Sequence, residues 1–338
     1  MTAEPKKRSW PVSLLRERSF QIAVVLWAAG SYAVFPLSGG TLPFNRPGMA
    51  GSSIERQVIF PHVVLAIFLI LLAVIYLLTR KRAIPDLAAR APNVPMAVRE
   101  TLALWGYGAI GMVLGRVIGM KVFGEGIGMH LNGSLFGATR VQSPAEVWTW
   151  AVYNFMWFAV VPCIVFCARG YSREALNLKS TNLGNDTLVI VVVLAIMLAL
   201  DLSGGSLLKL DPHQILVGGA ISFVMHLLGT GLPVMVFIYA IMMPRYARIT
   251  RSAAATTILG AASYAAVHIF EYWTVYDSVP HAILSVIFVF LTFMPPGLVK
   301  SYLTLRTGNA WVHLWAFHAI SPHVTGDTPN IVNVFRIQ

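Results

Sequence analysis

Imidazole side chains are concentrated near the end of the chain. Nine histidines occur in the 338 residues, and five of them fall between residues 268 and 323. Imidazole titrates near neutral pH and is the commonest metal ligand among side chains. An ionisable group inside an apolar segment is costly, so it marks a candidate functional site by default. The five are His268, His281, His313, His318 and His323.

The first candidate group combines a histidine with a carboxylate. Tyr264, His268 and Glu271 are spaced four and three residues apart, so on a helix they would share one face. A carboxylate beside an imidazole can fix its tautomer, raise its basicity, or join it in holding a metal ion or a water molecule. The same spacing also suits a buried His–Glu pair that only joins two helices, and both interpretations stay open.

The second group surrounds His318. His313 and His318 are five residues apart, which on a regular α-helix separates them by about 140°, so they should not face one site. Two flanking tryptophans favour an interfacial position for His313, in an aromatic belt. His323 follows Pro322 at a predicted helix end. It can turn back toward His318 as a ligand, but a loop position in solvent is the favoured interpretation.

The composition indicates which elements position these residues. The chain is 57% hydrophobic and 12% charged, with a mean hydropathy of +0.69, whereas soluble domains carry about 25% charged residues. Apolar stretches long enough to cross a hydrocarbon core of roughly 30 Å recur throughout. In lipid, only helices and closed barrels satisfy all backbone groups. The sequence therefore predicts an all-α, polytopic transmembrane helix bundle.

Ten apolar runs are expected to be helical. The sixth and seventh runs are each short for a crossing and are separated by Gly229 and Pro233. One broken helix over residues 213–244 keeps three following arginines on the cytoplasmic side, whereas two crossings would place them outside. The broken helix is favoured, which gives about nine crossings. The runs are 20–35, 58–78, 102–122, 146–167, 188–202, 213–228, 232–243, 253–273, 279–299 and 310–320.

The charge distribution predicts orientation and partners. The net charge is +11, but the basic residues lie between the apolar runs, as in Lys6–Arg8 and Arg80–Arg82. This is the positive-inside pattern and not a nucleic-acid-binding patch. We therefore expect a multi-pass protein of the cytoplasmic (inner) membrane of a bacterium, with a cytoplasmic N-terminus. The lipid bilayer is its expected partner, with a membrane protein or peptide as a further possibility and no nucleic acid.

Residues 173–323 resemble the CAAX protease and bacteriocin-processing family of intramembrane proteases. The segment Tyr264-x-x-x-His268 is similar to the family's Phe-x-x-x-His motif. The segment His318-x-x-x-Pro322 is similar to its last motif, His-x-x-x-Asn. Residues 239–245 resemble the family's segment just after its first motif, Glu-Glu-x-x-x-Arg. The resemblance implies a bundle of core helices that carries an endopeptidase site.

This sequence departs from the family at the paired glutamates. In that alignment they fall on Val234 and Met235, and no carboxylate occurs between Asp211 and Glu271. The resemblance assigns to a glutamate the activation of the attacking water, and to the histidines the stabilisation of charge. The resemblance therefore supports the fold of the family more than its activity.

Three parts of the chain are distinguished on this basis. Residues 1–170 are predicted to be N-terminal transmembrane helices, with a glycine-rich loop at 123–143 that is large enough to cover a cavity mouth. Residues 171–323 are predicted to be the protease-like core, and residues 324–338 a short C-terminal tail. No internal repeat is evident.

Three functions remain open. The favoured one is a non-catalytic membrane protein with a degenerate protease-like core that binds a partner, peptide or lipid, as an assembly factor, immunity protein or subunit would. An alternative is an active intramembrane peptidase, a hydrolase that uses His268 and His318 with Glu271 as the base. A third is a metal-dependent membrane enzyme in which these residues, with His323, hold zinc or iron. Convergence of the three catalytic candidates in space would favour chemistry.

Overall fold

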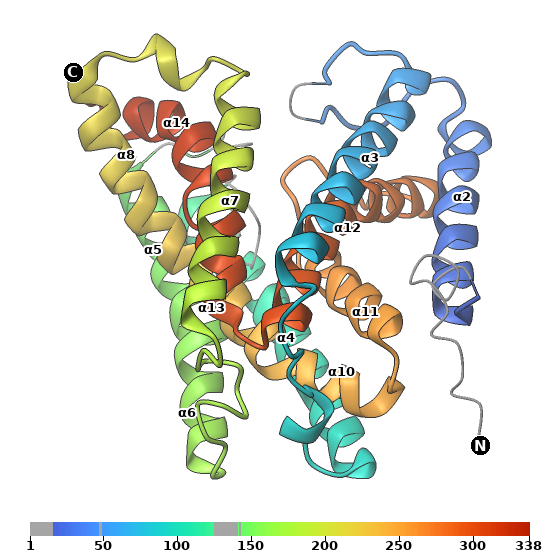
Figure 1. Ribbon diagram of the computed structural model, residues 1–338. Coiled ribbons are helices and arrows are strands. Elements are labelled where there is room, and N and C mark those ends of the chain that lie inside the picture. Colours follow the sequence, from blue (N-terminus) through green and yellow to red (C-terminus); the bar gives the residue numbers. More distant parts are fainter. Residues whose placement is uncertain (1–15, 47–48, 125–140, 142) are drawn as a thin grey trace, which may run out of the picture.

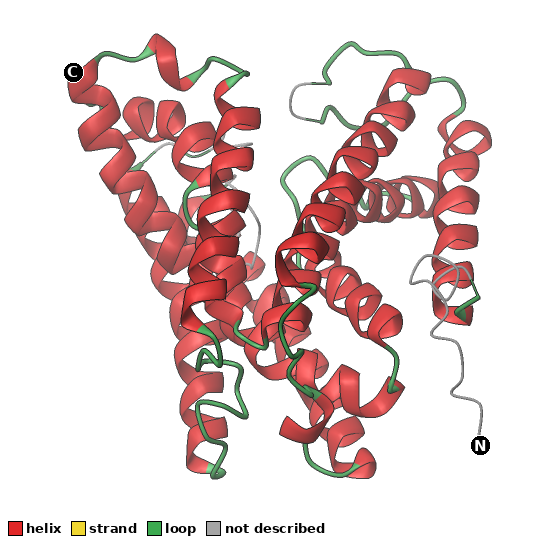
Figure 2. Ribbon diagram, in the orientation of Figure 1, coloured by secondary structure: helices red, strands yellow, loops and turns green. Residues whose placement is uncertain are grey.

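The computed structural model describes residues 16–46, 49–124, 141 and 143–338, and all regular structure in those ranges is helical (Figure 2). Seven helical segments there are long and apolar enough to cross a membrane. This confirms the prediction of an all-α, polytopic bundle. The seven are α2 (Arg18–Ser38), α3 (Ile54–Thr79), α4 (Val94–Phe123), Pro144–Ala168, α7 (Leu183–Leu202), Pro212–Thr250 and α12 (Val279–Thr307).

Two predicted runs are shorter than a full crossing. The run at 253–273 forms α11 (Ala253–Ala266) and then continues as turns. The run at 310–320 forms α13 (Ala310–His313) and the π-helical turn η7 (Leu314–His318). A second π-helical turn, η8 (Ser321–Thr325), leads into α14 (Gly326–Phe335). The predicted tail at 324–338 is thus mostly helix, and the count of nine crossings stays a prediction.

Residues Pro212–Thr250 form one helical run of 39 residues, as favoured over two separate crossings. The expected break at 229–233 takes the form of π-helical turns, in which the helix continues with wider hydrogen-bonded rings. Of the seven spans this one is the most buried. It consists of α8 (Pro212–His226), η5 (Leu227–Gly231), α9 (Leu232–Val234), η6 (Met235–Met242) and α10 (Met243–Thr250).

Local sequence signals define two helix starts. Ser143 accepts a hydrogen bond from the main-chain N–H of Glu146 at 3.3 Å and begins Pro144–Ala168, which comprises α5 (Pro144–Asn154), η3 (Phe155–Val160) and α6 (Val161–Ala168). Asp211 and Gln214 form a capping box at the start of α8. In each case a side chain satisfies an N–H group that the first helical turn leaves unpaired. Ser143 and Asp211 are therefore the N-caps of these helices.

Helices from both halves of the chain pack together (Figure 1). On one side, α12 packs against α3, α2 and α11; on the other, α14 packs against α8, and α7 packs against η7. The close approach of α12 to α11 depends on Gly297, because a Cβ atom there would lie 2.8 Å from the Cα of Ala261. Most of the predicted loop 123–143 lies outside the described residues, as does the basic segment Lys6–Arg8.

Candidate functional site

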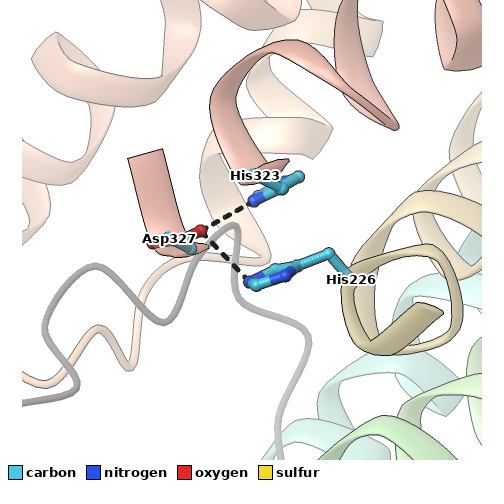
Figure 3. Close-up of side chains that lie close together, drawn as sticks. All are labelled: His226, His323 and Asp327. Atoms are coloured by element: carbon cyan, nitrogen blue, oxygen red, sulfur yellow. Dashed lines mark hydrogen bonds and ion pairs between the residues drawn. The ribbon is translucent and has the colours of Figure 1, made fainter. Parts of the chain in front are cut away.

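Two histidines and an aspartate meet inside the bundle, between α8 and α14 (Figure 3). His226 Nε2 and His323 Nδ1 each lie 3.1 Å from the same carboxylate oxygen, Oδ2 of Asp327. The two imidazole rings are stacked, with centroids 4.4 Å apart and planes 10° apart. None of the three residues is more than 2% exposed. Three potential ligand atoms of a metal ion therefore lie within 4.8 Å of one another.

The hydrogen bond at the far side of the His226 ring fixes its tautomer. Nδ1 of His226 lies 2.8 Å from the carbonyl oxygen of Ser222, so Nδ1 carries the proton and donates it. A neutral His226 then presents the lone pair of Nε2 to a carboxylate oxygen of Asp327. Two acceptors at 3.1 Å repel each other unless a cation, either a proton or a metal ion, lies between them. Metal-binding histidines typically donate their other N–H to a carbonyl in this way.

His323 is buried, so the interpretation that it is a loop histidine in solvent is wrong. The turn η8 and helix α14 return the chain to α8, where the hydroxyl of Ser222 donates to the carbonyl oxygen of His323 at 2.9 Å. Gly218 permits this approach, because a Cβ atom there would lie 2.6 Å from Val332. At the helix end predicted near Pro322, the chain therefore turns back into the core of the bundle.

His313 and His318 are both fully buried, with ring centroids 6.1 Å apart. The expectations that they diverge and that His313 is interfacial are both wrong. Both assumed a regular α-helix, whereas the N–H of Ala319 donates to the carbonyl of Leu314, five residues earlier, at 2.7 Å. This π-helical turn has more residues per turn, so positions five apart come to share a face.

Two of the three catalytic candidates approach each other around one tyrosine. The ring of Tyr264 lies 4.6 Å from that of His268 and 5.9 Å from that of His318. Glu271 is 5% exposed, and its main-chain N–H donates to the carbonyl of His268 at 3.0 Å. Because α11 ends at Ala266, His268 and Glu271 occupy turns and not one helical face. Their spacing along the sequence therefore does not place them on a common face.

The histidines form one continuous row. From His313 the row passes to His318 and then to His323, whose ring lies 5.2 Å from that of His318. It ends at the group of His226 and Asp327. Sequence reasoning missed His226 and Asp327. The spacing His323-x-x-x-Asp327 was the available local signal, since residues four apart face each other on a helix, but His226 is about a hundred residues away in the sequence.

A pocket of about 560 Å³ lies elsewhere, at the end of the bundle where α3 and α6 end. Pro85, Arg90 and Glu174 are among its lining residues. The guanidinium of Arg90 donates to the Asn177 side chain and to the carbonyl of Gly308, both at 2.6 Å. These bonds hold loops together at the surface. The buried histidines are therefore the stronger candidate for a functional site.

No protein-family model, no curated protein and no solved structure matches this chain. The resemblance to the CAAX protease family therefore rests only on the segments at 239–245, 264–268 and 318–322. Function is instead inferred from the geometry of the buried row.

Proposed function

We propose that this chain is a membrane metalloprotein that binds one divalent transition-metal ion through His226, His323 and Asp327. The observation that supports this most directly is the approach of His226 Nε2 to a carboxylate oxygen of Asp327 at 3.1 Å, while Nδ1 lies 2.8 Å from a carbonyl oxygen. A metal ion between Nε2 and the carboxylate would form a coordinate bond to each. Two imidazoles and one carboxylate form a donor set that suits zinc or iron.

Such a centre is suited to hydrolysis inside the membrane. Three protein ligands leave a coordination position open, where a metal ion activates a water molecule as a nucleophile. His318, next to His323, is placed to hold or move a proton beside that position. Thr230 also contacts His318, with its Oγ1 at 3.5 Å from Nε2. We therefore propose a metal-dependent hydrolase as the enzyme class.

A second proposal is a non-catalytic binding protein with a degenerate protease-like core. Its support is the position where the resemblance expects paired glutamates: Val234 and Met235 are there, 0% and 1% exposed, inside the main hydrophobic cluster. Packing of this kind leaves no room for a carboxylate pair that activates water. The two proposals differ in whether the histidine row holds a metal ion.

Elemental mass spectrometry of the detergent-purified protein separates the two proposals. We expect about one zinc or iron ion per chain in the wild type, and loss of the metal in His226→Ala and in Asp327→Asn. His281→Ala is the matched control, since the His281 side chain is 39% exposed and pairs with Asp277. A folded wild type without metal, after incubation with zinc and with iron, would refute the metal centre and leave the binding protein.

We also propose that the end of the bundle near α6 and α10 faces the cytoplasm of a bacterial cell. Arg82, Arg90, Arg245 and Arg306 all lie at that end, as the positive-inside rule favours. Three of them bond to helix ends or loops, and Arg245 pairs with Glu100. The chain ends at the opposite end of the bundle (Figure 1). A C-terminal alkaline phosphatase fusion should therefore be active, whereas a C-terminal green fluorescent protein should stay dark. The reverse pattern would contradict this orientation.

A further inference from the structure

A lysine lies deep inside the bundle. Lys300, on α12, is 1% exposed, and its Nζ lies 3.6 Å from the ring centroid of Tyr264 and 5.5 Å from that of Phe317. Within the described part of the chain, no carboxylate lies within ion-pair distance of this nitrogen. A buried ammonium needs a counter-charge or several acceptors, and the two aromatic faces supply only part of that stabilisation.

Four side chains near Lys300 carry buried polar atoms that make at most weak hydrogen bonds to the described residues, and the Tyr239 and Ser301 hydroxyls lie near each other. These atoms are the hydroxyls of Tyr239 and Ser301, both ring nitrogens of His313, and Nδ1 of His318. The Tyr239 ring lies 4.1 Å from that of His313, which in turn lies 6.1 Å from that of His318. Nearly all buried polar groups in folded proteins are paired. A cluster of such atoms therefore marks a place where a ligand can be bound.

The cluster contains a basic group and no acidic one. Lys300 and Ser301 are neighbours on α12, and the Tyr264 ring lies 3.6 Å from Nζ of Lys300 and 5.9 Å from the ring of His318. The amine, two hydroxyls and two imidazoles can each donate a hydrogen bond to an anion, and none of them is a carboxylate. The neighbouring group at Asp327 has the opposite character, since it contains a negative charge and suits a cation. The Lys300 cluster is therefore complementary to an anion.

We propose that Lys300, Tyr239, Ser301, His313 and His318 form a binding site for the carboxylate group of an amphiphile that enters from the bilayer. One ammonium balances one negative charge, which favours a carboxylate over a doubly charged phosphate ester. The site lies among membrane-spanning segments whose outer surfaces are apolar, so the alkyl chain of such a ligand would find apolar surroundings there. None of these five residues is among the three metal ligands proposed above.

Binding of radiolabelled oleate to the full-length protein in detergent tests this proposal. Oleyl alcohol has the same chain without the charge, and acetate has the charge without the chain. We expect oleate to bind the wild type, oleyl alcohol to bind at least about tenfold more weakly, and acetate not to compete, because a hydrogen-bonded charge contributes more than a neutral group. Acetate that displaces oleate at equal concentration would refute the bilayer route.

Substitutions test whether oleate binds at these residues. Lys300→Met keeps the length of the side chain and should weaken oleate binding at least about tenfold, while Tyr239→Phe removes one donor and should weaken it several-fold. Lys209→Met, at an exposed lysine, is the control and should bind like the wild type. Equal oleate affinity in wild type and Lys300→Met would overturn the proposal. If Lys300→Met does not fold, Tyr239→Phe is the variant to measure. Equal oleate affinity in wild type and Tyr239→Phe would also overturn the proposal.

The metal content of the same samples keeps the two proposals distinguishable. Lys300→Met should retain the metal ion, because none of the three proposed ligands is changed. Loss of oleate binding with normal metal content supports a separate anion site. A metal-free wild type that still binds oleate through Lys300 would refute the metal centre alone.

Discussion

We expect Glu100→Gln to destabilise the folded bundle severely, because Glu100 is the only carboxylate that pairs with a fully buried arginine in the described ranges. Its Oε2 lies 2.7 Å from one terminal nitrogen of Arg245 and 2.8 Å from Nε. A second arginine, Arg169, lies 2.8 Å from Oε1, and the Tyr171 hydroxyl contacts both oxygens. Arg245 is 0% exposed, so water cannot solvate its guanidinium once the Glu100 carboxylate is removed.

The expected magnitude follows from the different burial of the two arginines. Glutamine keeps the shape of the side chain but leaves Arg245 as an uncompensated buried charge, which costs about 3–5 kcal/mol of folding free energy. The Arg169 side chain is 45% exposed. Arg169→Gln should therefore cost only about 0–1 kcal/mol, since solvent screens an exposed ion pair.

Unfolding of the purified protein in mixed detergent micelles, followed by tryptophan fluorescence, measures both effects. The double variant Glu100→Gln, Arg245→Met should recover much of the lost stability, because removal of both partners leaves no charge unpaired. If Glu100→Gln lowers the free energy of unfolding no more than Arg169→Gln does, the Arg245 pair does not stabilise this end of the bundle and the reasoning fails.

Two glycine contacts give further predictions on stability. Gly297→Ala should cost about 1–3 kcal/mol or more, because its Cβ would lie 2.8 Å from the main chain of Ala261, which cannot move without shifting α11. Gly229→Ala would place a Cβ 2.2 Å from the Trp150 ring, so a similar loss is expected. Gly184→Ala is the control for both, since nothing lies within 4 Å of its added Cβ, and thermal unfolding in detergent should leave it near the wild type. A loss in this control as large as in the other two variants would contradict the steric explanation.

The sequence was sufficient for the features that local patterns encode. Long apolar runs predicted the spanning helices, since a helix that crosses lipid must be apolar over about 20 residues. Ser143 and Asp211 marked helix starts, since their side chains accept bonds from unpaired N–H groups. The three arginines after residue 244 pointed to one run at Pro212–Thr250. In these cases the deciding interaction lies within a few residues of the signal.

The site was harder to predict, because its geometry depends on departures from ideal helices and on distant contacts. A spacing of five residues separates His313 from His318 on an α-helix but not on the π-helical turn that the chain forms. The end of α11 at Ala266 could not be predicted from the apolar run at 253–273, because hydropathy does not indicate where main-chain hydrogen bonding changes. His226 meets Asp327 only because α14 folds back on α8.

Ligands at the two proposed sites would offset the desolvation penalty of burying Lys300 and Asp327. A lysine at the Lys300 position and a carboxylate at Asp327 are each expensive inside a bundle, and an apolar side chain would pack there without a desolvation penalty. Opposite charges in the same low-dielectric interior attract over longer distances than in water. A metal ion at Asp327 and an anion at Lys300 would therefore stabilise each other across His318 and His323, whose rings lie 5.2 Å apart. Ionisable groups of both signs beside one histidine row would suit the proposed hydrolase, in which an anionic ligand would lie next to a metal-bound water.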